Sequence, residues 1–180
     1  MVSPQALSED ERRLVAAWAA DCAARVLPLF ESEVPQDRRA RDGIERAHAF
    51  SRGDLDAAGE IRRRFEAGRA AQLAQSPAAV AAARAAGQAS GVAHMGAHAL
   101  GAAAYAVKAV SLAAPDRQDA RDEEVEWQLR HMTDQVRAAL LRLPLLGEDS
   151  AGPLGPGLLA SGILAVTIRE IQSDLAAGEK

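Results

Sequence analysis

The 180-residue chain has few cysteines, aromatic residues and lysines. Cys22 is its only cysteine, so no disulfide can form within the chain, and we expect a cytoplasmic location. Aromatic residues make up 3% of the sequence, and lysine occurs only at Lys108 and Lys180. The net charge is −4, whereas proteins that bind nucleic acid through its phosphates are usually basic. We therefore predict no nucleic-acid partner.

Signals for secretion and for membrane insertion are also missing from the sequence. Residues 1–13 contain no basic region followed by an apolar run, so we predict no signal peptide. The longest apolar stretch, residues 91–114, is mostly alanine and glycine, whereas membrane helices are rich in Leu, Ile and Phe. We predict that this stretch is a buried helix and that the protein has no membrane partner.

The residues that are abundant favour helices. Hydrophobic residues make up 48% of the chain, and alanine supplies most of them. Alanine is the best helix former and a poor strand former, and runs of β-branched residues with a period of two are absent. The sequence therefore predicts an all-α fold, a single compact bundle of five to six helices around a long Ala/Gly-rich central helix.

Capping residues and apolar spacing locate the individual helices. Ser8 and Glu11 have the spacing of a capping box, and Ser76 followed by Pro77 is typical of a helix start. Asp37 and Asp54 are predicted to cap the second and third helices. The predicted helices span residues 8–30, 38–52, 55–75, 77–114 with a break or kink near Gly87 and Gly91, 116–143, and 158–177.

Composition also predicts how the chain is organised into segments. Residues 1–143 are expected to form a helical domain, and residues 144–157, rich in Gly and Pro, a linker. Residues 158–180 form a C-terminal helix, in which apolar residues recur at helical spacing. Because this apolar stripe needs a surface to cover, the helix packs either on the domain or on a second copy. A homodimer through this helix is therefore one predicted partner arrangement.

His94 and His98 are the first candidates for a metal site. If their segment is helical, both imidazoles lie on one face, one turn apart. Zinc needs a third and usually a fourth ligand, and the sequence between them lacks the Glu of the H-E-x-x-H motif. Glu45 and His48 match the Glu-x-x-His spacing of di-iron bundles, but only once. We therefore favour structural histidines, with His94 and His98 as the ligands if any metal binds, and we predict no cofactor.

A wider polar cluster is the basis of an alternative function. Asp21 lies inside a mostly apolar helix and needs a polar partner if it is buried. With Cys22 and a histidine it could form a Cys–His–Asp set, one known arrangement for a nucleophile. The simpler interpretation is that Cys22 is a small buried apolar residue. We assign no catalytic residue. The alternative is a helical small-ligand or metal-binding protein with a site between the first and fourth helices, at Asp21, Cys22, Arg41, His94, His98 and Tyr105.

Two charged segments are candidates for binding surfaces. Arg62 to Arg64 spread around a helix, which is typical of a solvated surface. The acidic segment 116–126 holds six carboxylates against two arginines. Carboxylates near a helix N-terminus favour the helix dipole, and they also speed association with a basic partner. The candidate partner-binding residues are Asp119, Asp122, Glu123, Glu124 and Glu126.

Three stretches resemble one bacterial family. They are "AAWAADCAARVLPLFE" at 16–31, "DRRARDGIERAHAFSRGD" at 37–54 and "AAARAAGQASGVAHMGAHALGAAAYAVKA" at 81–109. Together with "EWQ" at 126–128 they resemble the immunity-five-like family of bacterial immunity proteins, over roughly residues 10–143. The resemblance implies a small, cytoplasmic, all-α, non-enzymatic protein that binds and neutralises a cognate toxin. The family often carries a histidine where this chain has Gln88.

Overall fold

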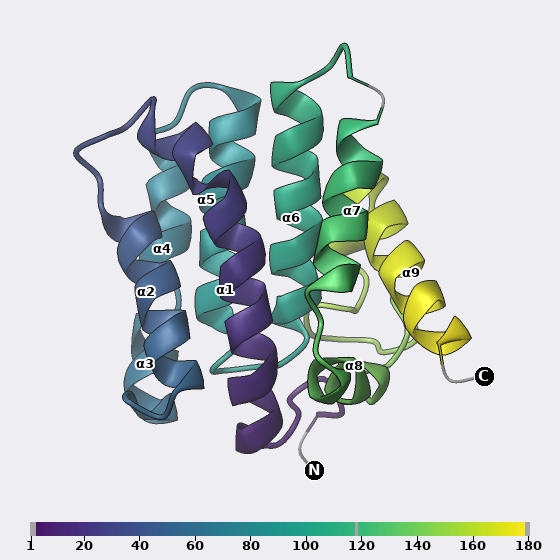
Figure 1. The fold of residues 1–180 in the computed structure, drawn as a ribbon. Coiled ribbons are helices and arrows are strands. Elements are labelled where there is room, and N and C mark those ends of the chain that lie inside the picture. Colours follow the sequence, from purple (N-terminus) through teal and green to yellow (C-terminus); the bar gives the residue numbers. More distant parts are fainter. Residues whose placement is uncertain (1–2, 118, 179–180) are drawn as a thin grey trace.

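The computed structural model describes residues 3–117 and 119–178, and these residues form helices and no strand. The all-α prediction is therefore confirmed (Figure 1). The predicted number of five to six helices is too low, because the predicted spans 55–75 and 116–143 are each divided. The elements are α1 (Glu9–Glu31), α2 (Arg39–Ser51), α3 (Ala57–Arg63), α4 (Glu66–Arg69), the 3-10 turn η1 (Ala70–Gln72), α5 (Pro77–Gly91), α6 (His98–Ala113), α7 (Ala120–Arg130), α8 (Asp134–Leu141), η2 (Leu158–Ala160) and α9 (Gly162–Ala177).

Helix α1 begins with the predicted capping box. The Ser8 hydroxyl accepts the backbone N–H of Glu11 at 3.3 Å, and the Glu11 carboxylate accepts the backbone N–H of Ser8 at 2.8 Å. Each side chain therefore satisfies an N–H group that the first turn of a helix leaves free. The inner face of α1, which includes Trp18, Val26 and Phe30, is buried against α2, α5 and α6.

The centre of the molecule is a pair of helices rather than one long helix. Alanine lines α5 and α6, and its small side chain lets these two helices pack closely (Figure 1). The predicted break is confirmed at Gly91, while Gly87 lies inside α5. The N-terminal segment stabilises the break, because the carbonyls of Gln5 and Ala6 accept the N–H groups of residues 97 and 96, both at 3.0 Å.

Two of the divided helices, α3 and α8, have side-chain caps of their own. Helix α3 is capped by Asp56, whose carboxylate accepts the N–H of Gly59 at 2.7 Å, and not by Asp54 as predicted. Asp37 does accept an N–H at the start of α2, that of Arg39, although α2 begins one residue later than expected. Helix α8 has a new N-cap at Thr133. Thr133 therefore starts a new helix within the predicted span 116–143, whereas α4 begins after Phe65 without a side-chain cap.

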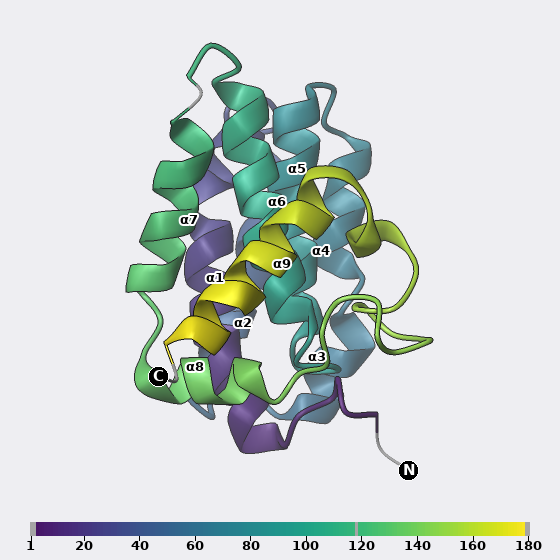
Figure 2. The same cartoon turned by 90° about the vertical axis from the view of Figure 1, so that its right-hand side faces the viewer.

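Helix α9 crosses α6 obliquely and contacts α7 and α8 as well (Figure 2). Its predicted apolar stripe is buried in the chain's own structure, at Leu164, Ile168, Ile171 and Leu175. The preceding Gly/Pro-rich segment contacts the N-terminal segment, since Leu154 donates its backbone N–H to Gln5 Oε1 at 2.9 Å. The assignment of 144–157 as a linker between two units stays a prediction. None of the described helices combines the length and apolar character needed to cross a membrane.

Candidate functional site

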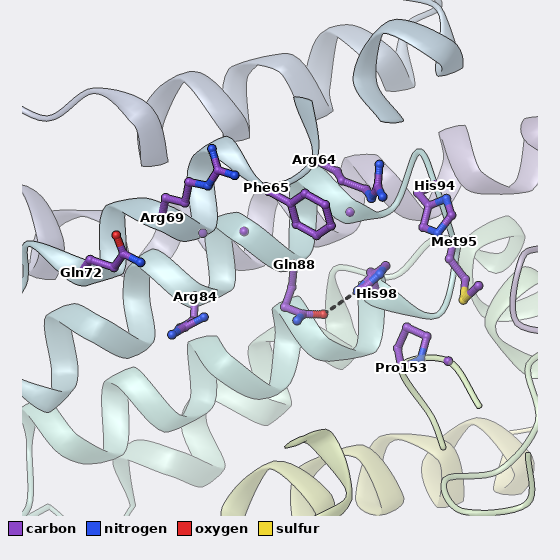
Figure 3. A pocket seen from close by; sticks show the side chains of 14 residues that line it. Arg64, Phe65, Arg69, Gln72, Arg84, Gln88, His94, Met95, His98 and Pro153 are labelled. Carbon is purple, nitrogen blue, oxygen red and sulfur yellow. Dashed lines mark hydrogen bonds between the residues drawn. The ribbon is translucent and has the colours of Figure 1, made fainter. Parts of the chain in front are cut away.

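A pocket of about 700 Å³ lies between the α3–α4 region, α5 and the loop that leads into α6 (Figure 3). A short segment before η2 closes one side of it. The lining residues are Arg64, Phe65, Gly68, Arg69, Gln72, Arg84, Gly87, Gln88, Gly91, His94, Met95, His98, Gly152 and Pro153.

Glycines allow the elements around this pocket to approach one another. A Cβ atom at Gly87 would lie 2.7 Å from the Cα of Gly68, so α4 and α5 meet backbone to backbone. A Cβ atom at Gly91 would lie 2.9 Å from the ring of His98. The absence of side chains at these positions therefore lets α4 approach α5 and leaves room for the imidazole.

His98 is held at the start of α6 by a hydrogen bond. Its Nδ1 lies 2.8 Å from Gln88 Oε1. With the amide oxygen facing the ring, Nδ1 donates, and Nε2 of the neutral ring is left as an acceptor. Burial, helped by the positive charges of His94 and Arg64, lowers the pKa of His98 to about 4. The ring is therefore uncharged at neutral pH.

His94 and His98 do not share one helix face. His94 is exposed in the loop of residues 92–97, whereas His98 is the first residue of α6. Burial of part of the ring and the charges of Arg64 and Arg12 lower the pKa of His94. The two histidines line the same pocket, but among residues 3–117 and 119–178 no three metal-ligating side chains of the His, Cys, Asp or Glu types come together.

The pocket is cationic. Arg64, Arg69 and Arg84 line it, and no carboxylate of the described chain does. The ion pairs found among the described residues use other arginines, such as Arg63 and Arg46. Arg64 instead donates to the carbonyl of residue 61 at 2.6 Å. The pocket therefore presents three guanidinium groups with no carboxylate among its described lining residues, and Arg64 uses one of its five N–H donors on a backbone carbonyl.

The other residues of the predicted polar cluster do not line this pocket. Asp21 is exposed, and its carboxylate lies 3.4 Å from His48 Nε2. Arg41 donates to the Glu31 carboxylate, with an Nε–Oε1 distance of 2.6 Å. Each of the two charged residues therefore has a partner elsewhere on α1 or α2.

Cys22 and Tyr105 are buried in the helical core. Burial raises the pKa of the Cys22 thiol well above its ordinary value, and the charges of Glu124 and Asp21 add to the effect. Burial also raises the pKa of Tyr105. Cys22 is therefore a protonated thiol, which is a poor nucleophile.

The acidic segment divides into exposed and buried carboxylates. Asp119, Asp122, Glu123 and Glu126 are exposed, and each has an arginine near it. The closest of these pairs joins Arg117 Nη2 to Glu123 at 2.8 Å. Such surface pairs are weak and stay open to solvent. These four carboxylates are therefore still accessible to a partner.

Glu124 has a different environment, being 3% exposed. Its carboxylate accepts from Arg25 Nε at 2.9 Å and from Gln128 Nε2 at 3.1 Å. The guanidinium of Arg25 also lies over Trp127, 3.9 Å from the ring centroid. Glu124 therefore joins α7 to α1.

A family comparison covers most of this architecture. Residues 5–135 match the model of the family described as "Imm-5 like putative immunity protein". The chain belongs to this immunity protein family. The matched region contains α1 to α7 and all of the pocket lining except Gly152 and Pro153, while α9 lies outside it. No curated protein and no solved structure matches the chain.

Sequence reasoning missed most of the pocket in this immunity-family chain. Arg64 was assigned to a solvated surface, and Phe65, Arg69 and Arg84 were not considered as site residues. These residues come from separate helical segments and have no motif spacing. The available signal was the Gly68 and Gly87 pair, because glycine inside a helix is unfavourable unless another element packs closely against it.

Proposed function

We propose that this protein is an immunity protein that binds a cognate toxin domain and neutralises it by protein–protein contact. The observation that carries this proposal is the family match over residues 5–135. The protein acts without catalysis, by covering a surface that the toxin needs. The proposal places it in the cytoplasm, where its single cysteine, Cys22, stays reduced.

The surface that we assign to the toxin is the exposed side of α7 with the residues just before it. Asp119, Asp122, Glu123 and Glu126 are exposed there. A basic toxin surface gains from their negative field, which acts mainly on the rate of association. Glu124 supports this surface from inside, through its contact with Arg25.

The test uses the protein encoded beside this gene as the candidate toxin. Coexpression of the two is expected to restore growth that the candidate toxin alone stops, and the purified pair should form a stoichiometric complex. Failure of both the growth rescue and the complex would overturn the toxin-binding proposal.

A charge variant tests the assigned surface separately. The triple variant Asp122→Asn, Glu123→Gln, Glu126→Gln should reduce the association rate at low salt by about three- to ten-fold, because steering raises such rates by 10-fold or more. The matched control, Asp10→Asn with Asp42→Asn and Glu45→Gln, removes three carboxylates from α1 and α2 and should leave the rate near that of the wild type. Equal rates for the wild type and the α7 variant would exclude this surface.

A further inference from the structure

The chemistry of the pocket in Figure 3 is separate from that of the acidic surface on α7. Its volume of about 700 Å³ is within the range of pockets that hold small organic ligands. The hydrogen bond between His98 and Gln88 and the close backbone contact of α4 with α5 hold its walls, so much of the site exists before a ligand arrives.

The charge of the pocket selects for an anion. The chain as a whole is acidic, with a net charge of −4, yet the described pocket lining contains three arginines and no carboxylate. Arg69 on α4 and Arg84 on α5 lie on opposite sides of one end of the pocket, with Gln72 beside them (Figure 3). Guanidinium groups bind phosphate through paired N–H donors, so this end suits a phosphate group.

The middle of the pocket offers an aromatic face. Phe65 is 58% exposed, although it is a large apolar side chain. Its ring lies between Arg69 and Arg64 in Figure 3, and the Arg64 guanidinium is 4.3 Å from its centroid. An exposed ring beside cationic groups gains apolar burial and stacking when a flat ligand covers it.

The opposite end supplies polar groups of another kind. The neutral His98 ring keeps Nε2 as an acceptor while Nδ1 donates to Gln88. An acceptor of this kind suits an N–H donor on the flat part of a ligand, and a second phosphate would not use it. We propose that this pocket binds a small organic phosphate carrying an aromatic ring, the nucleotide class, with its phosphate between Arg69 and Arg84 and its ring against Phe65.

The test is calorimetric titration of the full chain with ADP and GDP, and with adenosine and pyrophosphate as partial probes. At least one of the two nucleotides should bind more tightly than either probe. The variant Arg69→Gln/Arg84→Gln should bind it about ten-fold more weakly or worse, because it removes the charged hydrogen-bond donors to the phosphate. The control Arg62→Gln/Arg169→Gln, which removes two exposed arginines outside the lining, should bind as the wild type does.

Two further measurements test the contact with the ring and the folding of the variants. Phe65→Leu should weaken nucleotide binding and leave pyrophosphate binding unchanged, and thermal unfolding should show that all variants are folded. The proposal is overturned if neither nucleotide binds at millimolar concentration. It is also overturned if the variants Arg69→Gln/Arg84→Gln and Arg62→Gln/Arg169→Gln lose affinity for the nucleotide equally. Tighter binding of a polyglutamate peptide would also overturn it, since the pocket would then receive an acidic protein segment.

Discussion

At the scale of single residues, burial decides the behaviour of His98. The folded protein lowers its pKa to about 4 from an ordinary value of 6.5. Between these two pH values the unfolded chain binds a proton at this residue and the folded chain does not. Stability therefore falls as the pH drops from about 6.5 to about 4, and the loss at this residue is complete below that range.

This linkage can be measured by urea unfolding at about pH 7.5 and about pH 4.5. Over this interval the free energy of unfolding of the wild type should fall by about 2–3 kcal/mol more than that of His98→Asn, since one pKa unit corresponds to 1.36 kcal/mol. Asparagine keeps a donor near the position of Nδ1 but does not titrate. The control His131→Asn, at an exposed position, should follow the wild type. If the free energy of unfolding changed with pH in the same way in the wild type and in His98→Asn, the lowered pKa of His98 would be contradicted.

Cys22 and Asp21 show how little a residue's type reveals about its role. They are adjacent in the sequence, yet Cys22 faces the core and Asp21 lies at the surface beside His48. The helical period predicts which face is apolar, and Cys22 was correctly expected among the buried residues of α1. The partner of Asp21 comes from another helix, which local spacing does not determine.

At the scale of elements, the contact between α4 and α5 depends on one glycine more than on the other. A Cβ at Gly87 would lie 2.7 Å from Gly68 Cα and 3.1 Å from its nitrogen, whereas a Cβ at Gly68 would lie 3.7 Å from Gly87 Cα. The first contact forces two backbones apart, and the second is an ordinary van der Waals distance. The pair therefore offers a matched comparison.

Gly87→Ala is expected to reduce the free energy of unfolding by about 1–3 kcal/mol, because overpacking outweighs the helix preference of alanine. Gly68→Ala should leave the stability unchanged or raise it by up to about 1 kcal/mol. Chemical denaturation of both variants measures the difference. If Gly87→Ala were the more stable of the two, the close approach of these helices would be disproved.

At the scale of the whole molecule, α9 covers the bundle with its apolar stripe. Ile168 and Ile171 are fully buried in the chain's own structure, whereas Val166 on the same helix is 55% exposed. A homodimer through α9 stays a prediction, and it would have to use the exposed side of the helix. Burial of the stripe within one chain implies stability that does not depend on protein concentration.

Ile168→Ala should therefore destabilise the protein by about 2–4 kcal/mol. Val166→Ala, at the exposed position, should change stability by no more than about 0.5 kcal/mol. Thermal unfolding at several protein concentrations, with native mass spectrometry on the same samples, measures both effects. A midpoint that rises with concentration in the wild type, together with a dimer mass, would show that two copies of the chain associate.

The sequence by itself determined the helical class, the capping box of α1 and the buried stripe of α9, because these depend on residues within a few positions of one another. It also identified the family, through stretches such as residues 16–31 and 81–109. The divisions of the predicted spans 55–75 and 116–143 were missed. Thr133 caps α8 inside an otherwise periodic segment, and α4 begins after Phe65 without any side-chain cap that the sequence could reveal.

Only the tertiary structure decided which polar residues meet. It separated Asp21, Arg41 and Tyr105 from the two histidines, turned Glu124 inward, and placed Arg64, Arg69 and Arg84 around one pocket. These outcomes depend on the packing of α4 against α5 and on the loop that the N-terminal segment holds in place. Contacts between residues far apart in the chain are set by the packing of whole elements, which local periodicity does not encode.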